Sequence, residues 1–215
     1  MPDLKNRRPL NSRDTKWAAR ITRALAARGA TPNGISQASM GAAAVAGLAF
    51  WALAATSGGV WTALLLIVGA LCCQLRLLCN LFDGMVAVEA GRAAPDGPLW
   101  NEFPDRISDI LIFAGIGLGV GLPALGLAAA VMAVLTTYTR ELGAGIGLAP
   151  NFCGPMAKQH RMAVVTLAAI LALFETAIVP MGTSLTVALW LIALGAGVTA
   201  LRRAWRIREA LLARG

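Results

Sequence analysis

The sequence predicts an all-α integral membrane protein with about six transmembrane helices, preceded by an amphipathic helix at the membrane surface. Of the 215 residues, 57% are hydrophobic and only 14% are charged. The apolar residues form long runs separated by short charged segments. A soluble domain of this size carries far more charge, and a disordered chain far fewer apolar residues. The length fits a single membrane-embedded domain, 1–215.

The first predicted element is an amphipathic helix over 13–28. Trp17, Ile21 and Leu25 recur every four residues, and basic residues occupy the other faces. This pattern is typical of a helix that lies in the headgroup layer of an anionic leaflet. A basic tail that only sets the membrane topology is the alternative. We expect 1–36 to form a basic segment at the cytoplasmic surface.

Six apolar runs follow, each close to the roughly 20 residues that cross a bilayer. Two of them are short, so their ends are expected to extend into the flanking polar segments. The predicted spans are 39–56, 60–82, 107–121, 122–138, 162–179 and 184–201.

The positive charges predict the orientation of these spans. The formal net charge is +8, and the basic residues gather at both chain ends and in 89–106 and 140–161. Under the positive-inside rule all these segments face the cytoplasm, including the basic tail 202–215. In a bacterium this membrane is the inner membrane. Because the charge follows the membrane topology, the expected partners are membrane lipids and not nucleic acid.

Polar residues continue from the second predicted span into the start of the third. Asn80 and Asp83 are three residues apart, and Asn101, Asp105 and Asp109 are spaced by four, so each set shares one helix face. Their oxygens suit a hard cation such as Mg²⁺ or Mn²⁺. Helix capping at the membrane surface is the alternative. It leaves unexplained the acids inside an apolar span, where each costs about 2.5–3.5 kcal/mol.

The spacing of this segment resembles the motif of the CDP-alcohol phosphatidyltransferase family, D-x2-D-G-x2-A-R-x8-G-x3-D-x3-D. The first and third aspartates of that motif are asparagines here, and its arginine is a valine. Segment 31–36 also resembles the sequence with which that family enters its first span. The aligned residues are Asn80, Asp83, Gly84, Ala87, Val88, Gly97, Asn101 and Asp105.

The resemblance implies transfer of a phosphatidyl group from a CDP-alcohol such as CDP-diacylglycerol to an alcohol or alcohol phosphate. CMP is released, and the reaction belongs to phospholipid synthesis. In that family four aspartates bind two divalent cations. By position, the expected ligands of Mg²⁺ or Mn²⁺ are Asp83, Asp105, Asn80 and Asn101. Asp105 is also the expected catalytic base. The number of bound ions, one or two, remains open. The residues expected to admit the cytidine nucleotide are Gly84, Ala87 and Gly97.

Three cations lie near the inner ends of the fourth and fifth spans: Arg140, Lys158 and Arg161. One interpretation, which the resemblance supports, is that they bind a phosphate on the acceptor. The other is anchoring to anionic lipid headgroups.

Besides Asp109, two charged residues lie within predicted spans, Arg76 and Glu175. Arg76 is one helical turn before Asn80, so it can contact a phosphate in place of the motif arginine. A structural ion pair of Arg76 with Glu175 or Asp109 is the alternative.

Two other functions remain open at this stage. A catalytically silent relative would bind lipid or nucleotide, or act as a scaffold for other lipid enzymes. A small transporter is disfavoured, because the polar groups gather at the inner face and do not form a path across the bilayer. The resemblance also implies a homodimer.

Overall fold

The computed structural model describes residues 15–89, 95–175 and 179–214, and within these ranges the chain forms helices and no strand. The elements are α1 (Lys16–Ala27), α2 (Pro32–Ala52), a short 3-10 turn η3 (Leu53–Ala55), α3 (Gly59–Glu89), α4 (Gly97–Gly119), α5 (Pro123–Gly145), α6 (Lys158–Ala172) and α7 (Thr183–Leu212).

The helices agree with the predicted apolar runs but have different ends. Helix α3 continues past residue 82 to Glu89, α4 begins ten residues before 107, and α7 continues through the predicted basic tail to Leu212. The fifth run was predicted to reach residue 179, whereas α6 ends at Ala172. Hydropathy marks only the apolar part of a helix, and its backbone hydrogen bonds continue into polar residues at either end.

Three helices in the described part of the chain are long and apolar enough to cross a membrane by length and composition. They cover Pro32–Ala55, Gly59–Val88 and Thr183–Leu212. The fold is therefore that of an all-helical integral membrane protein.

Residues 31–36 begin α2 for local reasons. The Thr31 hydroxyl accepts a hydrogen bond from the Gly34 backbone N–H at 3.1 Å, and Pro32 occupies the first helical position. The threonine oxygen pairs one of the free N–H groups at the helix start, and proline has no N–H that would need a partner there. The sequence 31–36 is thus a helix start.

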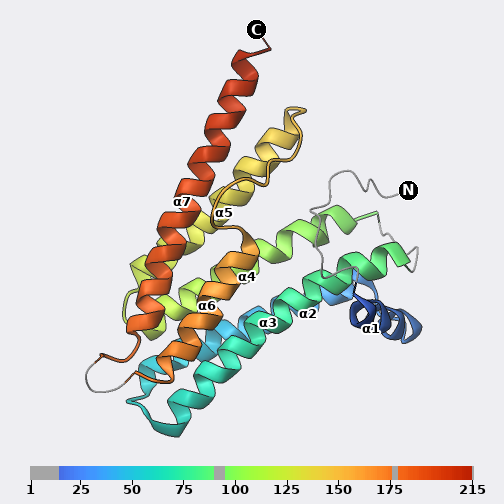
Figure 1. The fold of residues 1–215 in the computed structure, drawn as a ribbon. Helices are drawn as coiled ribbons and strands as arrows, with labels where there is room; N and C mark the ends of the chain where they lie inside the picture. Colours follow the sequence, from blue (N-terminus) through green and yellow to red (C-terminus); the bar gives the residue numbers. More distant parts are fainter. Residues whose placement is uncertain (1–14, 90–94, 176–178, 215) are drawn as a thin grey trace.

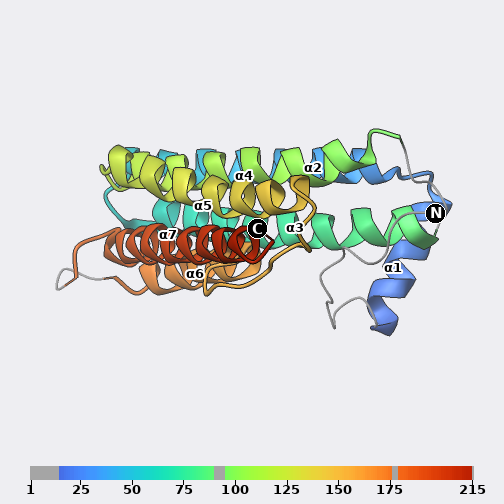
Figure 2. The same cartoon turned by 90° about the horizontal axis from the view of Figure 1, so that it is seen from above.

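The six long helices close into a ring. Contacts run from α2 to α3, α6, α7, α5, α4 and back to α2, and α4 also touches α7 across the ring. Seen from above, α2, α4 and α5 form one layer and α3, α6 and α7 the other (Figure 2). Since successive helices alternate in direction, α3 ends on the side of the ring where α4 begins, and α6 begins on the same side but beside a more central part of α3 (Figure 1).

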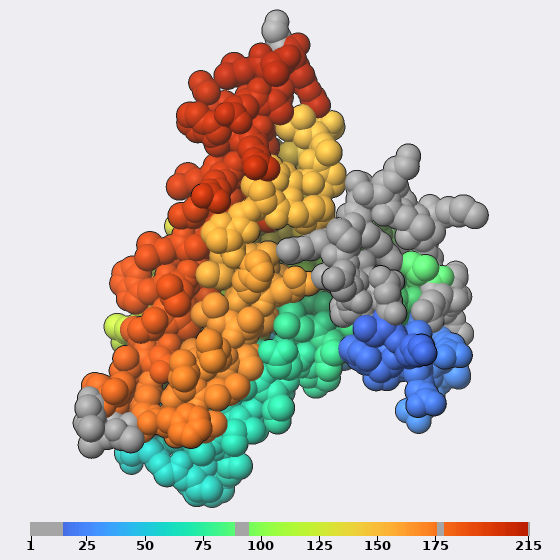
Figure 3. Space-filling view, in the orientation of Figure 1, coloured from blue at the N-terminus to red at the C-terminus, as the bar shows by residue number. Residues whose placement is uncertain are grey.

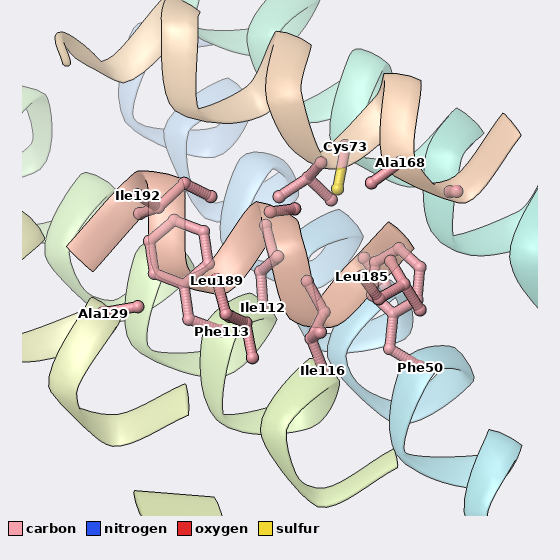
Figure 4. Close-up of a cluster of buried hydrophobic side chains, with 14 of the residues drawn as sticks. Phe50, Cys73, Ile112, Phe113, Ile116, Ala129, Ala168, Leu185, Leu189 and Ile192 are labelled. Carbon is pink, nitrogen blue, oxygen red and sulfur yellow. The ribbon is translucent and has the colours of Figure 1, made fainter. Parts of the chain in front are cut away.

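The hydrophobic core fills the middle of this ring. Phe50, Ile112, Phe113, Leu185 and Leu189 are all fully buried, and they come from α2, α4 and α7 (Figure 4). The polar ends of α3, α4 and α6 project beyond this apolar layer. The core therefore positions the ends of the helices, where the functional residues were predicted.

Helices α2 and α4 touch through their backbones. A Cβ atom on Gly115 would collide with the carbonyl oxygen of Gly47, and one on Gly119 with that of Phe50. Small residues are the usual means by which membrane helices approach this closely. This contact fixes the register between α2 and α4.

Helix α1 packs against the C-terminal part of α3 (Figure 3). Ala18 and Thr22 are buried, and the Trp17 ring meets Phe82 edge to face with 6.1 Å between centroids. Trp17 and Ile21 nevertheless remain 47% and 39% exposed. Helix α1 thus has one face on the bundle and apolar side chains left outside it.

The α2–α4 contact predicts a large difference between two glycine substitutions. Gly115→Ala should destabilise the fold by about 1–3 kcal/mol, because its Cβ forces the two helices apart. Gly41→Ala is the matched control, since a Cβ there meets nothing within 4 Å. Thermal unfolding in detergent micelles measures both. Equal midpoints for the two variants would contradict the close contact.

Candidate functional site

The polar residues of α3, α4 and α6 meet at the end of the ring where α3 ends and the other two helices begin. The innermost of them is Arg76, whose side chain is 0% exposed. Its Nη2 donates to Asp109 Oδ1 at 2.9 Å and to the backbone oxygen of Asp105 at 3.0 Å. Of the two alternatives for Arg76, the structure shows the ion pair with Asp109.

Asp109 is also bound from the other side. Arg161 Nη2 lies 2.6 Å from Asp109 Oδ2, and Arg161 Nη1 donates to the carbonyl of Met156 at 3.0 Å. Both side chains of this pair are 4% exposed. The result is a buried Arg–Asp–Arg cluster that joins α3, α4 and α6.

Glu175 lies at the opposite end of the ring. Its carboxylate accepts hydrogen bonds from the backbone N–H groups of Gly182 and Ser184, at 2.5 and 2.6 Å. These are among the free N–H groups at the start of α7, where a carboxylate is favourable. Glu175 is therefore a cap of α7 and not a partner of Arg76.

Asp105 is the carboxylate at the centre of the predicted site, and its side chain is 21% exposed. Lys158 Nζ lies 2.5 Å from its Oδ2, and Asn80 Nδ2 donates to its Oδ1 at 2.7 Å. Arg76 Nη2 is 3.6 Å from the same Oδ1. Three residues predicted from distant parts of the chain therefore meet here: Asn80, Asp105 and Lys158.

Asp83, only 6% exposed, lies one turn further along α3 than Asn80. Its Oδ2 accepts from Ser36 Oγ at 2.8 Å and its Oδ1 from the backbone N–H of Gly84 at 2.5 Å. Among the described residues it forms no ion pair, in contrast to Asp105. It is a buried carboxylate held by neutral donors.

Two serines of α2 complete the site, and the sequence reasoning missed both. Ser36 binds Asp83, and Ser39 Oγ donates to Asn80 Oδ1 at 3.1 Å. They are three residues apart and both are buried. Paired hydroxyls on the buried side of an apolar helix were the available signal, because a buried hydroxyl needs a partner.

Asn101 forms no hydrogen bond with this group in the described part of the chain. It is exposed at the start of α4, and its Nδ2 lies 3.4 Å from Glu102 Oε1. Of the four predicted metal ligands, the structure thus brings together Asn80 and Asp105, with Asp83 one turn away. Asn101 lies apart from these three residues, at the exposed start of α4.

The residues predicted to admit the nucleotide surround the same end of the ring. Gly84 follows Asp83 on α3, and Ala87 is one turn beyond it, half-buried. Gly97 is the first residue of α4, and a Cβ there would meet nothing within 4 Å. The chain is therefore open beside Gly97.

Arg140 is separate from the carboxylates of the motif. It pairs with Glu102 at 2.5 Å and Glu141 at 2.8 Å. Together with Arg206 it also lines a pocket of about 220 Å³ between the ends of α5 and α7. The three predicted phosphate-binding cations therefore have different surroundings. Arg161 is buried and paired with Asp109, Lys158 is paired with Asp105, and Arg140 borders this pocket.

A further contact joins the start of α2 to the start of α4. Asn33 Nδ2 donates to Asp96 Oδ1 at 3.0 Å, and Trp100 Nε1 to its Oδ2 at 2.9 Å. These two hydrogen bonds hold the pKa of the Asp96 carboxyl below its ordinary value. Asp96 stays ionised at neutral pH and ties the two helix starts together.

No protein-family model matches the chain. It is 28% identical to phosphatidylinositol phosphate synthase of Streptomyces avermitilis over 149 residues, covering 66% of this chain and 61% of that protein. It is 25% identical to the protein of the same name from Mycolicibacterium smegmatis over 200 residues, covering 90% and 84%. A bifunctional IPC transferase and DIPP synthase of Rubrobacter xylanophilus is 34% identical over 127 residues, covering 56% and 29%. The chain thus spans about three fifths of the Streptomyces relative.

Solved structures share the fold. Phosphatidylinositol phosphate synthase of Mycobacterium tuberculosis with CDP-DAG bound has a TM-score of 0.73 at 22% identity, covering 90% of this chain and 94% of that one. The same synthase with manganese and citrate has a TM-score of 0.72 at 22% identity, covering 88% of each chain. The fold, the curated relatives and the motif spacing all agree. Together they indicate similarity to the CDP-alcohol phosphatidyltransferase family.

The metal site expected of a CDP-alcohol phosphatidyltransferase is only partly present in these residues. Among the described residues, no group of three or more His, Cys, Asp or Glu side chains is arranged to hold a metal. Two carboxylates remain, Asp83 and Asp105, with the amide oxygen of Asn80 beside them. Such hard oxygen donors suit Mg²⁺ or Mn²⁺, and two carboxylates balance the charge of one such ion. The donor set therefore fits one divalent cation.

The Arg–Asp–Arg cluster predicts a strong effect of Asp109 on stability. Arg76 Nε and Nη1 and Arg161 Nε already lack a hydrogen-bond partner in the described part of the chain. Asp109→Asn removes the charge that compensates both guanidinium groups, so it should cost about 3–5 kcal/mol. Thermal unfolding of the purified protein measures this loss.

Glu141→Gln is the matched control for this variant. Glu141 also pairs with an arginine, but its side chain is 47% exposed. An exposed pair contributes about 0–1 kcal/mol, so E141Q should unfold near the wild-type temperature. Similar losses for D109N and E141Q would show that the buried cluster does not hold the helices together.

Proposed function

We propose that this protein transfers the substituted phosphate of a CDP-alcohol, such as CDP-diacylglycerol, to an alcohol or alcohol phosphate, with release of CMP. The observation that carries the proposal is the meeting of Asn80, Asp105 and Lys158 at one end of an apolar ring, with Asp83 one helical turn away along α3. A lipid donor needs the bilayer for its chains and an aqueous boundary for its nucleotide. The names of the curated relatives, two phosphatidylinositol phosphate synthases, support the same reaction.

The chemistry assigns Asp105 the role of base. The hydroxyl oxygen of the acceptor attacks the phosphorus next to the lipid alcohol, and the bond from that phosphorus to the CMP oxygen breaks. CMP leaves with the bonding electrons, and Asp105 takes the hydroxyl proton. A Mg²⁺ or Mn²⁺ ion held by Asp83 and Asp105, with Asn80 and Asn101 as neutral donors, would neutralise the phosphate charge.

The acceptor is proposed to be a small alcohol that carries a phosphate. Lys158 supplies half-buried positive charge at Asp105, and Arg140, paired with Glu102, borders the pocket shared with Arg206. Arg161 supports Lys158 from within α6 by fixing that helix to Asp109. The cytidine nucleotide is assigned to the face of Gly84, Ala87 and Gly97.

The membrane topology is proposed to have six spans, with both termini and the site at the cytoplasmic face. The whole chain, 1–215, then forms one embedded domain. The basic ends of the sequence support this orientation. Helix α1 is assigned to the headgroup layer, since Trp17 and Ile21 remain exposed beside Lys16, Arg20 and Arg23.

The direct test is CMP release. Purified protein in lipid nanodiscs receives CDP-diacylglycerol, Mg²⁺ or Mn²⁺, and a panel of alcohols and alcohol phosphates that includes inositol phosphate. Metal-dependent release is expected with at least one acceptor. Asp105→Asn should lower the rate at least about 100-fold, because it removes the base. Asp83→Asn should give a comparable loss through the metal.

The control variant is Glu209→Gln. Glu209 is an exposed carboxylate near the end of α7 that binds Trp205, and its replacement should leave the rate within about twofold. Absence of CMP release with every acceptor, together with retained binding of the CDP-lipid, would favour the catalytically silent relative. Asn80→Asp with Asn101→Asp then shows whether two more carboxylates restore turnover.

A further inference from the structure

The two carboxylates of the site differ in how their charge is balanced. Asp105 is paired with Lys158 at 2.5 Å, whereas Asp83 has only the neutral donors Ser36 and Gly84. Asn80, one turn before Asp83 on α3, also donates to Asp105, so both carboxylates lie at the same end of the ring. One cation that belongs to the chain is therefore already paired with a carboxylate expected to bind metal.

The position of Lys158 is unfavourable for a lysine in any other respect. It is the first residue of α6, where the helix dipole disfavours a positive charge, and no acidic residue lies in that first turn. The contact with Asp105 of α4 compensates for this cost. The lysine is thus placed by the site and not by its own helix.

The backbone around Lys158 is held in place. Met156 N–H donates to Thr199 Oγ1 at 3.1 Å, and Arg203 Nε donates to the Cys153 carbonyl at 3.0 Å. His160 Nδ1 lies 2.7 Å from the oxygen of Pro155. These contacts fix the segment before α6 against α7, so the ammonium is presented to Asp105 from a fixed start of the helix.

We propose that Lys158 is a resident cation of the transfer site, which supplies the positive charge of a second metal ion, so that the chain binds a single divalent cation at Asp83 and Asp105. Asparagines at positions 80 and 101 remove two negative charges from the motif, and Lys158 neutralises a third. What remains to be balanced is the charge of Asp83. This inference rests on the proposed function, since it names how that site stabilises a transferred phosphate.

The proposal makes metal binding and turnover move in opposite directions. Removing the ammonium leaves the negative charge of Asp105 unbalanced, so the affinity of the site for a divalent cation rises. The same change removes a positive charge from the phosphate oxygens, so turnover falls. A lysine with only a structural role would lower both together. A lysine that binds only the acceptor would change the KM for the acceptor and not the affinity for metal.

The experiment is a titration with Mn²⁺ alone, followed by the electron paramagnetic resonance signal of the free ion, on full-length protein in nanodiscs. Wild type is expected to bind one Mn²⁺ per chain. Lys158→Met should bind Mn²⁺ at least about tenfold more tightly, because a like charge beside the ligands is gone. Its turnover should fall at least about tenfold.

Lys158→Arg and Arg140→Met are the matched controls. K158R keeps the charge at the same place, and R140M removes a cation that pairs with Glu102 and not with Asp105. Both should bind Mn²⁺ within about threefold of wild type. If K158M does not fold, the wild-type stoichiometry and K158R still decide the question.

No bound Mn²⁺ or two ions per wild-type chain would overturn the proposal, as would unchanged or weaker binding by folded K158M. If the wild type releases CMP while any of these Mn²⁺ results is obtained, the proposed function stands and only the role of Lys158 is refuted. The expected Mn²⁺ pattern without CMP release would instead refute the proposed function and keep the assignment of Lys158 as the cation beside Asp105.

Discussion

The need to pair charges inside an apolar bundle is the constraint on which the rest of this structure depends. A buried guanidinium without a counter-ion is too costly, and Asp109 compensates two of them, Arg76 and Arg161. Because these three residues belong to α3, α4 and α6, the cluster sets how the three helices meet. The more exposed pair of Asp105 and Lys158 lies next to this cluster, because Arg76 also contacts Asp105. The site is therefore supported by ionic contacts and not by apolar packing alone.

Much of this arrangement could be predicted from local sequence. Apolar runs gave the positions of the long helices, and spacings of three and four residues gave the shared faces of Asn80 with Asp83 and of Asp105 with Asp109. The ends of the helices were less predictable. Hydropathy falls where α3 and α7 leave the apolar layer, although their hydrogen bonding continues for several residues.

The remaining features depend on contacts between distant parts of the chain. Lys158 lies 53 residues from Asp105 and Ser36 lies 47 from Asp83, so no local pattern reveals either contact. The sequence left two roles open for Arg76, and only the register of α3 against α4 selects Asp109. That register depends in turn on the glycines that let α2 and α4 touch. Ser36 and Ser39 reach the site through the packing of α2 against α3.

The length of α3 determines the depth of the site in the membrane. At 1.5 Å per residue, Asp83 lies about 36 Å along the helix from Gly59, somewhat more than the roughly 30 Å of a hydrocarbon layer. Trp61, which is 71% exposed near the start of α3, is suited to the opposite interface. In the proposed topology, Asp83 and Asp105 are then level with the phosphates of the surrounding lipids. A lipid donor can react there with its chains still in the bilayer, so no energy is spent on lifting them into water.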